Sequence, residues 1–297
     1  MSPPQFASAP PKTNTTLLSF PAPHVLLVIL NRPKDLNCIS SAGHVELDRV
    51  FSWLDAEPSL RVGIITGVGR AFCAGADLKE WNSQTSDDGS QNRPPLPPTG
   101  FGALSQRNGT AHKKPIVAAV NGLCFGGGFE MAVNADLIVA DADKAVFALP
   151  EVKRGVVAIA GALPRLVRTV GRQRAMEMAL TGRTVSAAEM REWGVVNKLV
   201  VGEKEHPEGT DGSTPIDQSP VVIEAIALAR LIAANSPDSV VVSKQGVEAG
   251  WTGEGVREGS ASLVRDWGDK LAAGENYREG LRAFVEKRPV RWVPSKL

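Results

Sequence analysis

The sequence predicts an α/β core followed by a helical C-terminal region. Short apolar runs typical of buried strands alternate with helical patterns as far as residue 201, and the residues after that carry helical patterns only. The chain has 297 residues, of which 43% are hydrophobic and 22% charged, which suits a globular protein with a substantial core. This order of elements favours a sheet covered by helices, with a helical appendage.

The composition argues against several classes of protein. The net charge of +1 implies no broad basic surface, so we expect no nucleic-acid partner. Three cysteines, Cys38, Cys73 and Cys124, lack the spacing of a disulfide framework, and with four scattered histidines they predict no metal site. No stretch approaches the roughly 20 apolar residues of a spanning helix, so no membrane partner is expected.

The first elements are predicted to be strand, helix and strand. Residues 25–30 read VLLVIL, a buried strand. Residues 41–55 have apolar positions at helical spacing, with Ser40 or Ser41 as the N-cap. Residues 61–67 form a second short apolar run that ends in glycine. All three belong to one core, for which we predict the bounds 17–201.

A long polar connection interrupts this core at about residues 82–114. It contains four prolines within five residues and no clear periodic pattern. Connections of this length are usually functional lids or disordered segments, and we expect a mobile loop beside the site.

The later elements follow the same logic. Residues 202–220 are rich in glycine, proline, serine and charge, which predicts a linker or surface insertion before a helical region at 221–294. Strands are expected at 115–120, 136–140 and 144–149 and towards residue 201, and helices at 129–133, 163–170, 173–181, 187–193, 222–234, 239–250, 253–273 and 277–285.

The most informative stretch is Gly126-Gly127-Gly128, between an apolar run and a helix that carries Glu130 in its first turn. Consecutive glycines let the backbone approach a ligand closely, since no Cβ is in the way. The first N–H groups of a helix have no partners within the helix and carry partial positive charge. The stretch is therefore a candidate site for a negatively charged oxygen, with a carboxylate beside it.

A second turn of small residues, Ala74-Gly75-Ala76, leads into a helix at Asp77, and Glu151 follows a proline. Two backbone donors aimed at one oxygen form an oxyanion hole, and two carboxylates can divide acid and base work. Simpler interpretations stay open. The glycines could serve packing alone, Glu130 could only complement the helix dipole, Glu151 could be a surface turn residue, and Asp77 could only cap its helix.

Taken in order, these motifs resemble those of the enoyl-CoA hydratase/isomerase, or crotonase, superfamily. The resemblance covers roughly residues 25–201. It is carried by residues 71–79 (AFCAGADLK), 121–130 (NGLCFGGGFE), 147–151 (FALPE), 180–183 (LTGR) and 193–197 (WGVVN).

The resemblance implies a fold, an assembly and a site. The fold is a crotonase-like spiral of ββα repeats, with C-terminal helices that pack three chains into a homotrimer or two trimers into a hexamer. The backbone N–H groups of Ala76 and Gly127 match the oxyanion hole, and Glu130 and Glu151 match the two acid/base residues. Contacts with the acyl-CoA substrate are implied for Lys34, Leu36, Ala74, Gly75, Asp77, Leu78 and Gly126.

The activity so implied is addition of water to a 2-enoyl-CoA to give a 3-hydroxyacyl-CoA, or the reverse dehydration. No cofactor is expected, because coenzyme A is part of the substrate. Residues 156–162 (VVAIAGA) depart from the Pro-Gly-containing segment of many hydratases, which indicates a different acyl pocket. Three alternatives remain: a Δ-isomerase with one working carboxylate, a specialised dehydratase of siderophore or toxin synthesis, and a non-enzymatic relative that binds RNA or acts as a scaffold.

The two ends of the chain carry one further expectation each. Residues 1–16 are rich in proline, serine, threonine and alanine without the apolar region of a signal peptide, which predicts a flexible tail. The chain ends in Ser295-Lys296-Leu297, the peroxisome address. We therefore expect binding to the peroxisomal import receptor and a peroxisomal location.

Overall fold

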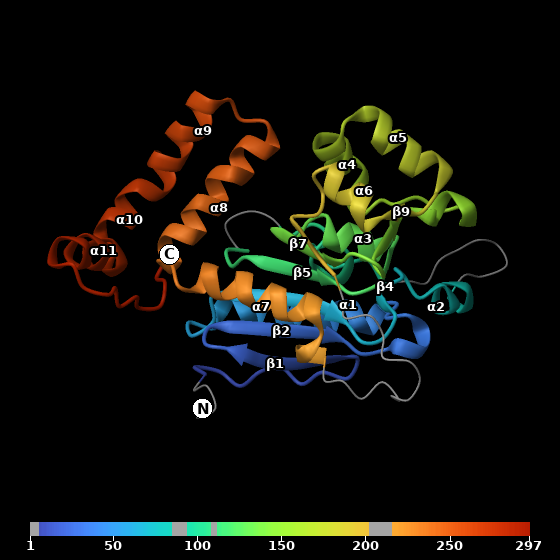
Figure 1. Ribbon diagram of the computed structural model, residues 1–297, viewed down its shortest axis with the longest axis horizontal. Helices are drawn as coiled ribbons and strands as arrows, with labels where there is room; N and C mark the ends of the chain where they lie inside the picture. Colours follow the sequence, from blue (N-terminus) through green and yellow to red (C-terminus); the bar gives the residue numbers. More distant parts are fainter. Residues whose placement is uncertain (1–5, 85–93, 108–111, 202–215) are drawn as a thin grey trace.

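A computed structural model of the protein describes residues 6–84, 94–107, 112–201 and 216–297. Two sheets and a set of helices make up this part of the chain (Figure 1). The larger sheet contains, in spatial order, β1 (Thr16–Ala22), β2 (Val25–Leu30), β3 (Val62–Gly67), β5 (Ile116–Val120), β7 (Leu137–Asp141) and β10 (Lys198–Val200). The smaller sheet contains β4 (Ala71–Cys73), β6 (Leu123–Phe125), β8 (Val146–Ala148) and β9 (Val185–Ser186).

The larger sheet is buried on both faces. Its strands are parallel except for β1, which is antiparallel to β2. Alternate residues of β2 enter different cores, because successive side chains of a strand point to opposite faces. Leu26 and Val28 pack in the cluster that contains Phe51, whereas Leu27 packs in the cluster that contains Ile226. Burial on both faces explains why these strands are continuous apolar runs.

The helices cover these faces and extend the chain beyond them. In Figure 1, α7 lies along the larger sheet, while α4, α5 and α6 lie together at one side of the molecule. The helices of the core are α1 (Ser41–Ala56), α2 (Leu78–Ser83), α3 (Gly127–Ala132), α4 (Ala162–Val170), α5 (Arg172–Thr181), α6 (Ala187–Glu192) and α7 (Pro220–Ala233). Short 3₁₀ helices are η1 (Pro33–Asp35), η2 (Phe101–Ala103), η3 (Pro150–Arg154) and η4 (Ile216–Gln218).

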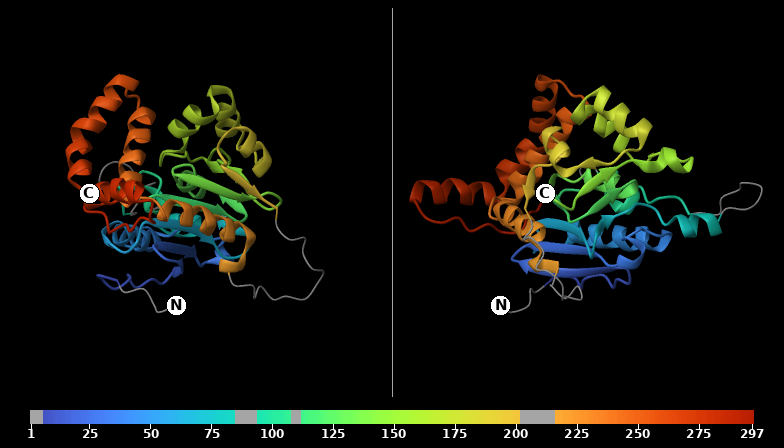
Figure 2. Two further views of the ribbon diagram at one scale, coloured as in Figure 1. Left: turned by 60° about the vertical axis from the view of Figure 1, so that its left-hand side comes forward. Right: turned by 45° about the vertical axis from the view of Figure 1, so that its right-hand side comes forward.

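The C-terminal helices form an arm at one end of the molecule (Figures 1 and 2). They are α8 (Pro237–Thr252), α9 (Val256–Leu263), α10 (Asp269–Ala273) and α11 (Glu275–Glu286), with a π-helical turn η5 (Val264–Gly268) before α10. A small core of Val241, Val242 and Trp267 holds the arm together. The predicted α/β core and helical C-terminal region are both present. Among the described residues no single helix has the length and apolar composition of a membrane span; only the pair α7 and α8, bent by 105°, meets that criterion jointly.

The smaller sheet explains where the site lies. Strands β4, β6 and β8 are parallel neighbours, so their carboxyl ends meet at one edge. The segments that follow them carry Ala76, Gly127 and Glu151 respectively. Three stretches separated in the sequence are thereby brought side by side, as is usual for ligand sites of parallel sheets.

The expected flexible tail is wrong for residues 6–15, which pack on the core. The Phe6 ring lies 4.7 Å from that of Phe20 and 5.3 Å from that of Trp53 between ring centroids. The backbone N–H groups of Asn14 and Thr15 donate to the buried carboxylate of Glu46, at 2.6 and 3.0 Å. A buried carboxylate requires such donors, and a phenylalanine gains from leaving water. Residues 1–5 lie outside the described residues.

The expectations for two other segments are tested only in part. Of the loop predicted at 82–114, residues 85–93 and 108–111 lie outside the described residues. Phe101 and Leu104 in the described part are buried in the core, so this portion is packed rather than a free lid. Of the linker predicted at 202–220, residues 202–215 are not described, and α7 begins at Pro220.

The last three residues lie against the rest of the protein. A carboxylate oxygen of Leu297 accepts from Lys113 Nζ at 2.5 Å, and the Leu297 side chain packs on the small core of the C-terminal arm. Lys296 forms an ion pair with Glu275. Leu297 N–H donates to the Ser295 hydroxyl at 3.2 Å. The predicted peroxisomal targeting tripeptide therefore makes contacts with the folded chain.

Candidate active site

A cavity of about 640 Å³ opens at the carboxyl ends of β4, β6 and β8. Its walls include both turns of small residues and both glutamates picked out from the sequence. Ala74, Gly75, Ala76, Gly126, Gly127, Glu130 and Glu151 all line it.

The two turns touch each other at this cavity. A Cβ added to Gly75 would lie 3.2 Å from the Gly127 nitrogen and 3.1 Å from the Phe125 carbonyl oxygen. Gly75 also has a φ of 98°, which a residue with a side chain rarely adopts. Glycine at this position therefore permits the close approach of the two backbones.

Ala76 and Gly127, whose amides are the predicted oxyanion donors, both lie in the cavity wall. Ile39 N–H donates to Gly75 O at 2.9 Å and Asp77 N–H donates to Ile39 O at 3.2 Å, so the backbone bridge uses the residues on either side of Ala76. The Ala76 N–H consequently points away from Ile39. Gly127 is the first residue of α3, whose N–H has no acceptor within the helix. Neither N–H has a backbone acceptor among the described residues.

The tight packing that the sequence left open as the simpler interpretation of these glycines is present. A Cβ on Gly128 would lie 2.2 Å from the Cys73 carbonyl oxygen in β4. A Cβ on Gly127 would lie 2.6 Å from the Phe101 ring. Close contact with β4 places the beginning of α3, and thus the Gly127 N–H, at the edge of the smaller sheet.

Glu130 is a buried acid with a defined orientation. It stands in the first turn of α3 and is only 4% exposed. Ala162 N–H donates to its Oε1 at 3.2 Å. Burial raises the pKa of Glu130, against the opposing effects of the amides at 160–162 and the positive charge of Arg165. A surface carboxylate that only complements the helix dipole would not be held this way.

Glu151 is the more perturbed of the two acids. Burial, together with the nearby negative charge of Glu130, raises its pKa to about 7, against the opposing effect of the Glu151 amide. Its Oε2 is buried and has no hydrogen-bond partner among the described residues. A Cβ on Gly126 would lie 3.0 Å from Glu151 Oε1, so glycine there makes room for the carboxyl. A carboxyl with a pKa near neutrality can both give and take a proton.

Four of the seven predicted substrate contacts line the cavity and three do not. Ala74, Gly75, Leu78 and Gly126 are in its walls. Lys34 is exposed on η1. The Leu36 carbonyl accepts from Ala74 N–H at 3.0 Å and so helps to hold the turn at residues 74–76.

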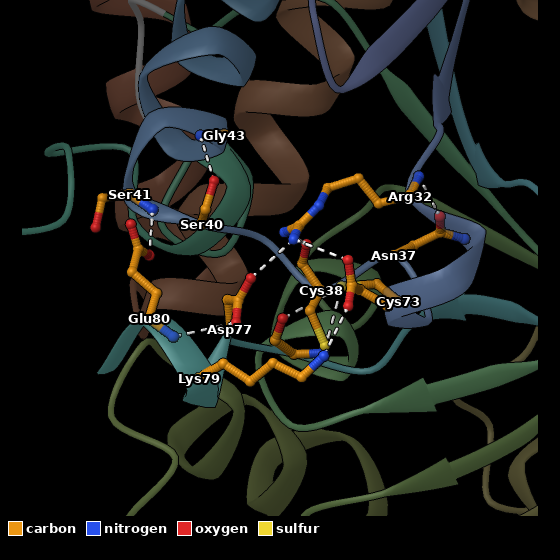
Figure 3. A network of polar contacts seen from close by, with 12 residues as sticks. Arg32, Asn37, Cys38, Ser40, Ser41, Gly43, Cys73, Asp77, Lys79 and Glu80 are labelled. Atoms are coloured by element: carbon orange, nitrogen blue, oxygen red, sulfur yellow. Dashed lines mark hydrogen bonds and ion pairs between the residues drawn. The ribbon is translucent and has the colours of Figure 1, made fainter. Parts of the chain in front are cut away.

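Asp77 caps its helix, which is the structural role that the sequence left open as an alternative to substrate contact. Its side chain caps α2 by accepting from Glu80 N–H at 3.3 Å and pairs with Arg32 at 2.9 Å (Figure 3). Arg32 also binds Asp35 and donates to the Cys38 carbonyl. The Ser41 N–H donates to Glu80 at 2.8 Å, which joins α2 to the beginning of α1. This network fixes the chain on both sides of Ala76, the predicted oxyanion donor.

Sequence reasoning missed several residues of the cavity wall, chiefly His44, Ser41 and Phe101. The four histidines were treated as scattered, yet His44 lies on the buried face of α1 with Leu47 and Phe51. A histidine at a core-facing position of an amphipathic helix was the available signal. No cluster of three or more histidine, cysteine or acidic side chains that could hold a metal occurs in the part of the chain that the structure describes.

Two backbone amides and two carboxyls in the wall of one cavity are the groups that an enzyme stabilising an oxyanion and moving protons would need. The chain matches the family described as enoyl-CoA hydratase/isomerase over residues 22–210. It therefore belongs to the enoyl-CoA hydratase/isomerase family, the crotonase superfamily. The predicted crotonase-like fold and hydratase activity are confirmed.

Individual relatives cover nearly the whole chain. It is 49% identical over 289 residues to a mevalonyl-coenzyme A hydratase of Aspergillus fumigatus, covering 97% of this chain and 98% of the relative. It is 52% identical over 297 residues to the mevalonyl-coenzyme A hydratase of Beauveria bassiana, covering 98% and 99%. A solved enoyl-CoA hydratase from Mycobacterium marinum has 34% identity and a TM-score of 0.77, with 94% and 98% of the two chains covered.

Proposed function

We propose that this hydratase acts on a branched, hydroxylated acyl-CoA of the mevalonyl type, by dehydration of the 3-hydroxyacyl-CoA or hydration of the 2-enoyl-CoA. The two relatives named for that substrate support the acyl group, since they match nearly end to end. The departure at residues 156–162 supports a specialised pocket, because Val156, Val157, Ile159 and Ala160 line the cavity. The observation that carries the chemistry is the pair Glu130 and Glu151 beside the amides of Ala76 and Gly127.

The backbone donors act on the thioester carbonyl. Addition of water to the conjugated double bond, or removal of the C2 proton, develops negative charge on the thioester oxygen. The N–H groups of Ala76 and Gly127 would stabilise that charge without reorganising. Removing one such donor typically costs about 10²–10³ in turnover.

The two acids have environments suited to different steps. In hydration, ionised Glu130 accepts a proton from water as the water oxygen bonds to C3, and protonated Glu151 donates a proton to C2. Dehydration reverses both transfers: Glu151 removes the C2 proton and Glu130 protonates the departing hydroxyl. The pKa of about 7 at Glu151 suits both directions. An isomerase would need only one of the two carboxylates.

The function is tested with purified protein, mevalonyl-CoA and crotonyl-CoA, by mass spectrometry of the products. Loss of one water from mevalonyl-CoA, or gain of one by crotonyl-CoA, is expected. A product of unchanged mass with a moved double bond would show an isomerase and overturn the proposal, and so would failure to convert any enoyl-CoA.

We further propose that the chain assembles as a trimer, alone or paired into a hexamer, through the C-terminal arm. Val264, Leu281, Phe284 and Val285 on the arm are 56–84% exposed in a single chain. Exposed apolar groups of this size usually mark an interface. Light scattering should give three or six times the mass of one chain, and a monomer at micromolar concentration would contradict the assembly.

A peroxisomal location is also proposed, from Ser295-Lys296-Leu297 at the end of the chain. A fluorescent protein fused ahead of residue 1 should give punctate fluorescence that becomes diffuse when Leu297 is deleted. Punctate fluorescence that survives the deletion would contradict this address.

A further inference from the structure

His44 lies deep in the cavity, close to the oxyanion hole. It is 7% exposed, and its ring meets the edge of Phe101 with centroids 4.5 Å apart and an interplanar angle of 78°. Phe101 also contacts Gly127, since a Cβ on Gly127 would be 2.6 Å from the ring. One aromatic ring therefore separates His44 from an oxyanion donor. With the thioester carbonyl held at Gly127 as proposed, the acyl group of the substrate would lie nearer to His44 than the distal end of coenzyme A.

The tautomer of His44 follows from its one hydrogen bond. Gly102 N–H donates to Nδ1 at 3.0 Å, so Nδ1 is the acceptor and carries no proton. Burial lowers the pKa of His44 to about 4, so the ring is neutral near pH 7. Its proton is consequently on Nε2. Among the described residues, none accepts a hydrogen bond from this Nε2–H.

Ser41 presents a second polar group on the same side of the helix. It precedes His44 by three residues, a spacing that places side chains together on one helix face, and both line the cavity. The Ser41 backbone donates to Glu80, and its hydroxyl has no partner among the described residues. The Phe101 ring, which contacts His44, supplies an apolar part of the same wall.

We propose that His44 Nε2–H and the Ser41 hydroxyl recognise a hydroxyl group on the acyl chain beyond the reacting carbons. This inference rests on the proposed function and assigns residues to its substrate preference. A hydroxyl is both donor and acceptor, so it matches one fixed donor beside one serine hydroxyl. A plain alkyl chain would leave the His44 N–H without a partner in an apolar wall, and such mismatches discriminate between substrates.

The test uses two substrates that differ only in the terminal hydroxyl: 5-hydroxy-3-methylpent-2-enoyl-CoA and 3-methylpent-2-enoyl-CoA. The readout is the ratio of their kcat/KM values, which does not depend on how much of a variant is folded. His44→Asn retains an acceptor for Gly102 N–H but no donor towards the cavity, whereas His44→Gln retains a donor. Ser41→Ala removes the second group, and Ser52→Ala, an exposed serine of α1 outside this cavity, is the matched control.

The wild-type protein should favour the hydroxylated substrate. His44→Asn and Ser41→Ala should each lower the ratio about tenfold, the effect of one hydrogen bond, and His44→Gln and Ser52→Ala should largely keep it. A wild-type ratio near one overturns the inference. Equal losses on both substrates also overturn it, since His44 would then hold the coenzyme A arm or support the fold. Absence of turnover on both substrates overturns the proposed function instead.

Discussion

The negative charge of Glu130 raises the pKa of Glu151, although the two residues are 21 positions apart in the sequence and belong to different elements. Neighbouring strands β6 and β8 bring them to one cavity. Two acids with different environments can divide acid and base roles. Glu130 is held by a backbone amide, whereas Glu151 has a buried oxygen without a partner among the described residues.

The first prediction concerns pH. With a Glu151 pKa of about 7, kcat/KM for hydration should fall as the pH rises through 7, because the proton donor is lost. Dehydration should show the same fall in kcat/KM, because it uses the same pair of carboxyls holding one proton, now on Glu130, and the reaction takes up or releases no proton overall. In Glu130→Gln the Glu151 pKa should fall, because a like charge is removed, and NMR titration of the carboxyl would measure it. An unchanged or higher pKa would contradict the coupling.

Gly128→Ala tests how α3 is positioned. The new Cβ would lie 2.2 Å from a backbone oxygen of β4, so the beginning of α3 has to move. Overpacking of this kind costs about 1–3 kcal/mol of unfolding free energy. We expect a lower melting temperature and a loss of turnover on the order of 10²-fold from the misplaced oxyanion donor. Gly250→Ala, where nothing lies within 4 Å of the new Cβ, should be neutral or stabilising; equal behaviour of the two variants would refute the account.

Asp77 is predicted to act on stability rather than on substrate affinity. Asp77→Ala removes the α2 cap and the contact with Arg32, which should lower the unfolding free energy by about 1–2 kcal/mol. Asp77→Asn can still cap, so its loss should be smaller. Denaturant titration measures both variants. Full stability together with a raised KM would instead assign Asp77 to the substrate.

Lys113→Ala should expose the C-terminal tripeptide, if the proposed address operates. The change removes the cation that holds the Leu297 carboxylate, so the receptor should bind the folded protein several-fold more tightly. Lys12→Ala, at an exposed position elsewhere, is the control. Calorimetry with the purified receptor domain gives the affinities. Identical affinities for the wild type and the Lys113 variant would show that this contact does not restrict the address.

Much of the fold could be predicted from the sequence, for a physical reason. Strands such as β2 and β3 are buried on both faces and so appear as continuous apolar runs. Of the smaller sheet only β8 was predicted, as the strand at 144–149; β4, β6 and β9 have two or three residues each, too few to show a period. Yet that sheet is what brings the site together.

The candidate catalytic residues could be picked out from the sequence because glycine turns precede them, and the structure brings them to one cavity. Gly75 and Gly126 have backbone angles that favour glycine. Glu130 and Glu151 follow these turns in the sequence. His44 and Ser41 gave no such signal, since their importance depends on which side of α1 faces the cavity. The packing of residues 6–15 was equally hidden, because it depends on Phe6 meeting Phe20 and Trp53 across the fold.

The most direct test of the central claim is the turnover of Glu130→Gln, Glu151→Gln and the double variant on one enoyl-CoA. Both glutamines retain shape but cannot exchange protons. We predict that each single change lowers kcat by about 10²–10⁴, with much less than the product of the two losses in the double variant, since the acids act together. Near-normal kcat in either folded single variant would contradict a mechanism in which both carboxyls take part.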